Sequence, residues 1–442
     1  EMGTEVARQL KLIGVHINFA PVMDVNSNPN NPVIGRRSFG EHPEKVAAKS
    51  IAYMRGLQDQ GILAVAKHFP GHGNTHLDSH YDLPILTDTT AQLATTALLP
   101  FEQAIKAGLQ GMMVAHLHTP AYDATPHRPA TLSPAIVTHL LKTQLGFQGL
   151  TFTDALNMKA VTKHYKPGEA ALLALKAGND VLVFPEDVPV SIAYIQQAIQ
   201  QGELAPSVVD EKVKKILRLK YQMHLHQWKP IDSQHLAEQL HTPQAKLLKQ
   251  QLFEQAVTVV ANEDNLIPLR DLDQLRIASL SIGEAACAVP VQKGSLEAID
   301  DVGLQVPSER SVFSTMLHKY APVDTYTLVR TAMTPEKWDA LASALQDYSV
   351  VIVDMHGMHG KHSRQFGLMT EELQFLQELA EETNVIVVPF GSVYSLACLQ
   401  DFSHVIMPYE DDVVAEKVVP QIIFGTLPAL GHLPVSISEH WQ

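Results

Sequence analysis

The chain has 442 residues, a length that favours two domains because a single hydrophobic core rarely grows so large. Hydrophobic residues make up 45% of it and charged residues 18%, as in ordinary globular proteins. The net charge of -14 argues against a nucleic-acid partner, and no apolar run approaches the roughly 20 residues that cross a bilayer.

The first residues have a helical pattern, because Val6, Leu10 and Ile13 recur at helical spacing. A signal peptide would show a basic start, an apolar run and small residues, and this terminus has no such pattern. We therefore expect the natural chain to begin upstream of Glu1, so this end of the sequence does not indicate a compartment.

Short apolar runs alternate with helical runs through the first half of the chain. The predicted strands cover residues 15–19, 62–66, 111–115, 150–153 and 181–184. The predicted helices cover residues 44–60, 98–107, 134–144, 169–177, 190–201 and 207–221. Such strand–helix repeats predict a parallel sheet that is covered on both faces by helices.

Polar residues gather in the loops that follow these strands, which is typical of a TIM-type barrel with its site at the carboxyl ends of the strands. We predict an α/β fold with a (β/α)8 TIM-type barrel over residues 1–226. About five strands precede the linker, whereas a closed barrel has about eight. We interpret the difference as an N-terminal part of the barrel that is missing from this sequence.

A second domain is predicted after a polar, His-rich linker over residues 227–243. The strand–helix pattern then restarts, with a helix over 245–257 and strands over 277–282, 325–329, 350–354 and 385–389. We predict an α/β sandwich domain over residues 244–442.

The densest stretch of chemistry-bearing side chains runs from Lys67 to His80. Its histidines recur at every fourth position, which on a helix would form a zinc-binding face. Pro70 and Gly71 argue against a continuous helix. A metal site built by the loop stays open as an alternative, but we predict none.

Other candidate residues directly follow predicted strands. Asp154 comes after the strand at 150–153 and either faces a substrate or caps the following helix. Asp24 follows the first strand, and the adjacent Arg36 and Arg37 either lie in a solvated turn or supply one partner for Asp24. His116 and His118 follow the strand at 111–115 and either line the pocket or make structural hydrogen bonds.

These motifs, taken in order, resemble family-3 glycoside hydrolases, and within them the β-N-acetylglucosaminidase branch. The second domain resembles the family's sandwich domain more weakly, at Leu266-Ile267-Pro268 and Phe424-Gly425-Thr426-Leu427-Pro428. In the first half the resemblance is carried by Asn18-Phe19-Ala20-Pro21-Val22-Met23-Asp24-Val25, Arg37-Ser38-Phe39-Gly40, Lys67-His68-Phe69-Pro70-Gly71-His72-Gly73, Asp78-Ser79-His80 and Phe152-Thr153-Asp154.

The resemblance implies a set of roles. Asp154 matches the nucleophile that forms a covalent glycosyl-enzyme intermediate, His80 matches the general acid/base, and Asp78 matches the residue that orients His80. Asn74 stands where the branch usually has Asp, so a charge-dependent role at that position is in doubt. The positions that match sugar-holding residues are Asp24, Arg37, Lys67 and His68, and we add His116 from its place after a strand.

A histidine suits this chemistry on physical grounds. Glycoside cleavage needs an acid for the leaving oxygen and a carboxylate for the oxocarbenium-like centre. An imidazole, with an ordinary pKa of about 6.5, is poised for proton transfer and places no second negative charge beside Asp154. Asp78 lies two residues before His80, close enough in a turn to fix the tautomer of the ring.

The resemblance therefore predicts a retaining exo-β-N-acetylglucosaminidase that acts on terminal GlcNAc in murein fragments (muropeptides) or chitooligosaccharides. It implies no cofactor. A peptidoglycan-recycling role is consistent with the branch, and the frequent export of such enzymes favours a periplasmic or extracytoplasmic location.

Three alternatives stay open. The first is a phosphorylase that passes the glycosyl group to phosphate. The second is a β-glucosidase of the same family with an acid from the second domain, for which Glu410-Asp411-Asp412 is the acidic cluster, although we interpret that cluster as a solvated loop. The third is a non-catalytic carbohydrate-binding protein, which would be expected to lack Asp154 or His80.

Overall fold

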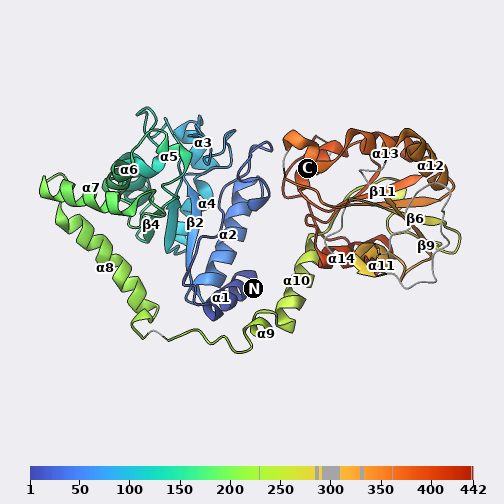
Figure 1. Ribbon diagram of the computed structural model, residues 1–442, viewed down its shortest axis with the longest axis horizontal. Helices are drawn as coiled ribbons and strands as arrows, with labels where there is room; N and C mark the ends of the chain where they lie inside the picture. The colour runs from blue at the N-terminus through green and yellow to red at the C-terminus, as the bar shows by residue number, and fades with distance from the viewer. Residues whose placement is uncertain are drawn as a thin grey trace. The chain divides into compact units, whose positions relative to one another are not determined.

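The computed structural model describes residues 1–227, 229–283, 288–290, 309–328, 333–360, 362–439 and 441. The chain forms two compact units, Glu1–Thr242 and Pro243–Gln442 (Figure 1). Each unit has its own sheet and its own hydrophobic core. Within the described residues, every helix is too short or too polar to cross a membrane.

The first unit is built around a parallel four-stranded sheet in the order β1-β2-β3-β4. Nearly every residue of the last three strands is buried, as expected where helices cover both faces of a parallel sheet. The strands are β1 (Ile17–Asn18), β2 (Leu63–Phe69), β3 (Gly111–Val114) and β4 (Leu150–Thr153).

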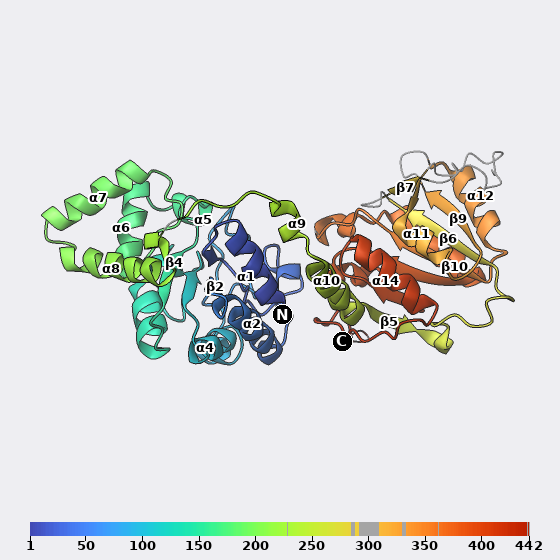
Figure 2. The same cartoon turned by 90° about the horizontal axis from the view of Figure 1, so that it is seen from below.

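Helices follow the strands, as in the strand–helix repeat of a TIM-type barrel. Figures 1 and 2 both place α1 and α2 on the β2 side of the sheet and α7 and α8 on the β4 side. The helices of this unit are α1 (Met2–Leu12), α2 (Pro43–Gln58), α3 (Thr90–Thr95), α4 (Leu99–Lys106), η3 (Ala135–Gln144), α5 (Lys159–Thr162), α6 (Pro167–Ala177), α7 (Val188–Gln200) and α8 (Pro206–Gln222). Short 3-10 turns lie at η1 (Gly35–Arg37), η2 (Ala130–Leu132) and η4 (Leu225–Gln227).

The contact between α1 and α2 depends on two glycines. A Cβ on Gly3 would lie 2.3 Å from the carbonyl oxygen of Tyr53, and a Cβ on Gly56 would lie 2.7 Å from the amide nitrogen of Thr4. The two helix backbones therefore approach closely at this crossing.

The strand predicted over residues 181–184 is wrong in extent. Only Val181 pairs with the sheet, through a single bridge to Phe152. The chain then leaves the sheet direction because Phe184 adopts a positive φ of 48°.

The segment predicted as a linker contains a short helix, α9 (Leu236–Leu240). The second unit begins with α10 (Pro243–Ala256), which starts two residues earlier than predicted.

The second unit contains a six-stranded sheet in the order β5-β12-β11-β10-β6-β9. All neighbours are parallel except β5 and β12. The sheet strands are β5 (Thr258–Asn262), β6 (Ile277–Ile282), β9 (Val323–Leu328), β10 (Val350–Met355), β11 (Asn384–Pro389) and β12 (His404–Met407), and a separate hairpin pairs β7 (Ala288–Pro290) with β8 (Glu309–Ser311).

Helices cover both faces of this sheet, which agrees with the predicted sandwich. Figure 1 shows α11 and α14 on one face and α12 and α13 on the other, and a hydrophobic core lies under each pair. These helices are α11 (Val312–Leu317), α12 (Pro335–Leu345), α13 (Thr370–Glu382) and α14 (Val413–Ile423), with 3-10 turns at η5 (Glu263–Asn265), η8 (His362–Gly367) and η9 (Val393–Cys398).

The four strands predicted in this unit are present, and the one over 277–282 has the same limits as β6. The sequence analysis missed β5 and β12. Both are edge-side strands of four or five residues, and β5 directly follows a helix, so neither stands out as a separate apolar run.

Candidate active site at the carboxyl ends of the barrel strands

Asp154 is the first residue after β4, so its carboxylate lies at the carboxyl end of the sheet. Its Oδ1 accepts a hydrogen bond of 2.8 Å from the amide of Ala155. Burial by itself would raise the pKa of this carboxyl group. The nearby His116, His68 and Lys67, together with the hydrogen bond from the Ala155 amide, outweigh burial and hold the pKa below its usual value. The group is therefore an ionised carboxylate at neutral pH.

His116 lies behind this carboxylate. Its side chain has no exposed surface, although the sequence predicted a substrate contact there. Its Nδ1 is 2.9 Å from the hydroxyl of Thr131, and its Nε2 is 3.0 Å from the carbonyl oxygen of Ala155. A carbonyl can only accept, so Nε2 carries the hydrogen. Both ring nitrogens are thus engaged inside the protein, next to the residue that follows Asp154.

Asp24 is also fully buried, and its carboxylate is surrounded by donors from the chain itself. It accepts from the amide of His68 at 3.2 Å, from Nδ1 of the same residue at 2.7 Å, and from the amide of His72 at 2.7 Å. Burial would raise the pKa of Asp24, but the adjacent His68 and His72 hold it below its usual value. The carboxylate fixes the start of the loop that follows β2.

Lys67 lies near Asp154, and Arg37 lies near Lys67. Arg37 does not pair with Asp24 among the described hydrogen bonds; its Nη2 lies 3.5 Å from Nε2 of His68, and its Nη1 donates to the carbonyl oxygen of Val33. Burial lowers the pKa of Lys67, and the charge of Arg37 lowers it further, while Asp154 opposes the shift. Lys67 is therefore close to both Arg37 and Asp154.

Asp78 and His80 form a hydrogen-bonded pair. Oδ1 of Asp78 accepts from the His80 amide at 2.8 Å and lies 2.7 Å from its Nδ1. The carboxylate accepts, so Nδ1 is the donor, and Nε2 makes no hydrogen bond to any residue that the structure describes. The His80 side chain is 62% exposed. The carboxylate of Asp78 thus reaches the ring of His80, as the spacing of two residues predicted, and holds one of its nitrogens.

The sequence analysis missed His72 as a residue that supports this pair. Its side chain is 1% exposed, its Nδ1 is 2.7 Å from the Thr75 hydroxyl, and its Nε2 is 3.4 Å from the hydroxyl of Ser79. Burial lowers the pKa of His72 to about 4, so the ring is neutral. Ser79 stands between Asp78 and His80, and its carbonyl oxygen also accepts from the amide of Ala160. His72 therefore connects the start of the loop to the Asp78–His80 segment.

A repeated His spacing was the available signal for His72, but spacing alone does not separate a buried supporting ring from an exposed one. The four histidines of the loop have different environments. His68 is held by Asp24, His72 by Thr75, and Nδ1 of His76 lies 3.2 Å from the side-chain amide of Asn28.

Asn74 also has a defined role in the loop. Its side-chain amide donates to both carboxylate oxygens of Asp88, at 3.1 and 3.0 Å. An amide is suited to this contact, because an aspartate at the same position would place a second carboxylate against Asp88.

The cluster Glu410-Asp411-Asp412 is more than a solvated loop, so that interpretation is wrong. Asp412 caps α14 through the amide of Val414 and pairs with Lys249 at 2.6 Å. Asp411 accepts from the ring of His356 at 2.9 Å. Glu410 is exposed.

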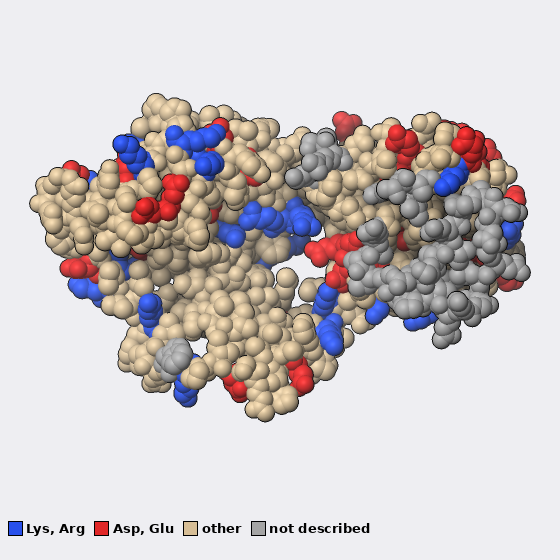
Figure 3. Space-filling view, viewed as in Figure 1, with Lys and Arg blue, Asp and Glu red and all other residues tan. Residues whose placement is uncertain are grey.

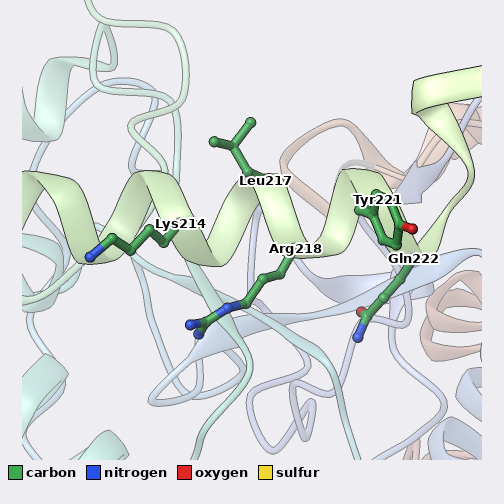
Figure 4. Close-up of a pocket in the computed structure, with 5 residues that line it drawn as sticks. All are labelled: Lys214, Leu217, Arg218, Tyr221 and Gln222. Carbon is green, nitrogen blue, oxygen red and sulfur yellow. The ribbon is translucent and has the colours of Figure 1, made fainter.

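A shallow hollow on α8 contains none of the predicted site residues. Figure 4 shows side chains from a single helix around it, namely Lys214, Leu217, Arg218, Tyr221 and Gln222. On the face drawn in Figure 3, acidic and basic side chains form small separate groups in a surface that is mostly neither.

Comparison with known proteins shows the family of this chain. Residues 1–219 match the family described as glycosyl hydrolase family 3 N terminal domain. Beta-hexosaminidase A of Pseudoalteromonas piscicida is 29% identical in an alignment that covers 99% of this chain and 76% of that protein. The chain belongs to glycoside hydrolase family 3.

Other relatives of this family-3 chain match either half of it or nearly all of it. Beta-hexosaminidase LpqI of Mycobacterium tuberculosis is 38% identical over 50% of the chain, and the match spans 58% of LpqI. The structure of a family-3 beta-N-acetylglucosaminidase from Paenibacillus sp. str. FPU-7 has a TM-score of 0.77 and 27% identity, and the match covers 99% of this chain and 80% of that one. A beta-glucoside phosphorylase, BglX, shares the fold with a TM-score of 0.80 at 20% identity, covering 98% of this chain and 78% of that one.

Proposed function

We propose that this family-3 chain is a retaining exo-β-N-acetylglucosaminidase that removes terminal GlcNAc from murein fragments or chitooligosaccharides. The observation that carries the proposal is an ionised carboxylate, Asp154, in the same barrel unit as an exposed imidazole, His80, that is held by Asp78. The names of the relatives, beta-hexosaminidase and beta-N-acetylglucosaminidase, support the choice of sugar.

In the first step, the carboxylate of Asp154 attacks the anomeric carbon of the terminal sugar. The bond from that carbon to the leaving oxygen breaks, and His80 in its imidazolium form donates the Nε2 proton to that oxygen. The products of the step are a glycosyl ester on Asp154, the shortened oligosaccharide and a neutral His80.

In the second step, the neutral Nε2 of His80 removes a proton from a water molecule. The water oxygen attacks the anomeric carbon, the ester bond to Asp154 breaks, and GlcNAc leaves with its anomeric configuration retained. His80 returns to the imidazolium form. Asp78 keeps the Nδ1 hydrogen in place throughout, so the exchanging proton stays on the nitrogen that faces the substrate.

The remaining polar groups suit a neutral sugar with several hydroxyls. Lys67 provides a donor beside Asp154, and its positive charge also helps to keep that carboxylate ionised, while Arg37 lies near Lys67. We propose that these two side chains bind the sugar directly. Because Asp24 and His116 have no exposed surface, we propose that they position His68 and Asp154 instead.

The test compares an aryl β-N-acetylglucosaminide with an aryl β-glucoside as substrates for the chain. We expect a strong preference for the acetamido sugar, and mass spectrometry of the quenched reaction should detect a glycosyl adduct on Asp154. An equal or reversed preference would reject the substrate class, and a product of inverted configuration would reject the covalent mechanism.

A glycosyl transfer to phosphate is the second candidate, favoured by one feature of the site. The proposed acid/base is an imidazole, and the cation of Lys67 lies near Asp154, so an anionic acceptor would meet no carboxylate base. In phosphate buffer, GlcNAc as the only sugar product would exclude a phosphorylase, whereas GlcNAc-1-phosphate would replace the hydrolase proposal.

A further inference from the structure

A cluster of carboxylates surrounds one histidine in the second unit. His356 is the first residue after β10, and Asp354 lies within that strand. Asp411 lies in the loop after β12, and Glu416 lies in the first turns of α14. His356, Asp354 and Glu416 have no exposed surface, and the side chain of Asp411 is 22% exposed.

The cluster occupies the position in the fold where open α/β sheets bind ligands. After β6 the chain crosses to β9 on one side of it and then to β10 on its other side, so the strand order reverses between β6 and β10. Ligands of such sheets bind at the carboxyl ends of the strands beside this reversal. The amide of His356 donates to the carbonyl oxygen of Ile282, the last residue of β6, at 2.8 Å, which places the ring at that point.

The side chains are arranged as in a metal site with an outer supporting residue. One ring nitrogen of His356, a carboxylate oxygen of Asp411 and a carboxylate oxygen of Glu416 all lie within 4.8 Å of one another. The other ring nitrogen, Nε2, is 3.0 Å from Asp354. A carboxylate on the far nitrogen of a ligating histidine is the common way to fix the orientation of its ring.

The supporting carboxylate is itself held by the neighbouring strand. The hydroxyl of Ser281 donates to Asp354 at 2.7 Å, and the hydroxyl of Ser279 lies 3.3 Å from it. The ring of His356 also stacks on Phe390, with centroids 4.7 Å apart and planes 7° from parallel. The ring is therefore fixed by several contacts before any ligand arrives.

A second, independent observation points to a bound cation. Oε2 of Glu416 accepts from the amide of Phe313 at 2.9 Å, but Oε1 is buried and has no hydrogen-bond partner among the described residues. A buried carboxylate oxygen without a partner is costly, and such groups in native proteins usually have a donor or an ion. This side chain belongs to the same three-residue group as His356 and Asp411.

We propose that Nδ1 of His356, Asp411 and Glu416 bind a Zn²⁺ ion, with Asp354 orienting the ring. One imidazole nitrogen and two carboxylate oxygens suit zinc better than calcium or magnesium, which prefer oxygen ligands alone. The ion takes the place of the proton on Nδ1, which is released to solvent, and water completes the coordination. The ion would tie the end of β10, the loop after β12 and the start of α14 together.

The test measures zinc binding to the full chain after it has been stripped with EDTA and dialysed. We expect the wild type to bind one more Zn²⁺ per chain than Glu416→Gln and Asp411→Asn, and Asp354→Asn to bind that ion about 10–100-fold more weakly. The control is Glu372→Gln, a second buried glutamate of the same unit, which should bind zinc like the wild type.

Differences between variants decide the result, because barrel histidines could bind zinc in every one of them. If Glu416→Gln and Asp411→Asn bind zinc with the stoichiometry and affinity of the wild type, the proposal is rejected. A wild type that takes up no zinc rejects it too, and then a proton shared between Glu416 and Asp411 explains the cluster.

Folding is checked by thermal unfolding in EDTA and in zinc. The site predicts that zinc raises the melting temperature of the wild type and of Glu372→Gln more than that of Glu416→Gln. If Glu416→Gln does not fold, Asp411→Asn decides, because Asp411 lies at the exposed rim of the cluster.

Discussion

Both units place histidines and carboxylates at the carboxyl ends of parallel strands, but they combine them in opposite ways. In the barrel unit a carboxylate, Asp154, is set among His116, His68 and Lys67, which hold its pKa below the usual value against burial. In the sandwich unit a histidine, His356, is set among carboxylates. Burial lowers the pKa of His356, but Asp354 and Asp411 outweigh it and raise the pKa to about 10.

Two buried histidines also show that neighbouring groups, and not burial alone, set the direction of a pKa shift. His72 and His356 both have almost no exposed surface, yet the pKa of His72 is lowered to about 4. Burial dominates at His72, although the nearby Asp24 opposes it, whereas two carboxylates in direct contact dominate at His356. The protonation state of a histidine at a strand end is thus set by its contacts rather than by its place in the fold.

The two units also differ in how exposed a histidine is: His80 is exposed, whereas His356 is buried. Proton transfer to a substrate needs a ring nitrogen that reaches solvent, and the exposed His80 has one. His356 has both nitrogens engaged by carboxylates and no exposed surface, so it is suited to holding structure or an ion.

The largest expected effect comes from removing the carboxylate of the barrel site. Asp154→Asn keeps the size of the side chain but removes the nucleophile, so we expect kcat to fall about 10⁴-fold or more. Initial rates with an aryl β-N-acetylglucosaminide measure it, and the exposed Asp59→Asn is the matched control. Turnover within tenfold of the wild type would contradict the role of Asp154.

Removing the exposed imidazole should have the next largest effect. We expect His80→Gln to lower kcat about 10²–10⁴-fold for substrates with a poor leaving group. The loss should shrink for a dinitrophenyl leaving group, which needs no protonation. His42→Gln, at the start of α2, is the control, since that side chain is also exposed. An equal loss with both leaving groups would argue against proton donation by His80.

The contrast between the two buried histidines predicts a pH dependence of stability. His72 has a folded pKa of about 4, whereas the unfolded chain has the ordinary value of about 6.5. Between these values the unfolded chain binds a proton that the folded chain does not. The contribution of His72 to the free energy of unfolding is therefore fully present above about pH 6.5. It is lost as the pH falls toward 4, and the loss is up to about 3 kcal/mol.

This dependence is measured by urea unfolding of the full chain at pH 7 and pH 5. Hydrogen exchange of peptides from β2 and β4 monitors the unfolding of the barrel unit. His72→Gln has no proton to gain, so its stability should change less between the two pH values. Equal changes in the wild type and in the variant would show that His72 is not the group responsible.

The smallest expected effect comes from adding a carboxylate to the loop after β2, which would then have two neighbouring carboxylates, as the cluster around His356 does. Asn74→Asp removes two hydrogen bonds to Asp88 and places two carboxylates together, so we expect a loss of about 1–2 kcal/mol in unfolding free energy at neutral pH. The loss should diminish below about pH 4, where carboxyl groups gain protons. Denaturant unfolding at both pH values measures this, with the isosteric Asn265→Asp on an exposed turn as control. A loss that does not depend on pH would rule out charge repulsion.

Much of the fold and of the site could be predicted from residue patterns. Several short apolar runs form buried parallel strands, namely β2, β3, β4, β6, β10 and β11. Near-continuous hydrophobic runs of this kind are typical of parallel strands that are buried on both faces. The pairing of Asp78 with His80 was also predictable, because two residues of separation in a turn bring the side chains within reach.

Other features depended on contacts between distant parts of the chain. Asp24 is enclosed by the end of β2 and the loop after it, at His68 and His72, which lie 44 and 48 residues later in the chain. The support that His72 gives to Ser79 depends on how that loop folds back on itself. No local pattern distinguishes such a residue from an exposed histidine at the same spacing.

The sequence by itself determined the strand–helix order, the position of Asp154 after a strand and the Asp78–His80 pair, because each depends on residues that are close along the chain. The tertiary structure alone decided which charged groups are buried and what surrounds them. It set Asp154 among His116, His68 and Lys67 and set His356 among carboxylates, and it brought Glu416 of α14 to the end of β10. The physical reason is that solvation and Coulomb energy depend on distance in space, which the tertiary packing sets.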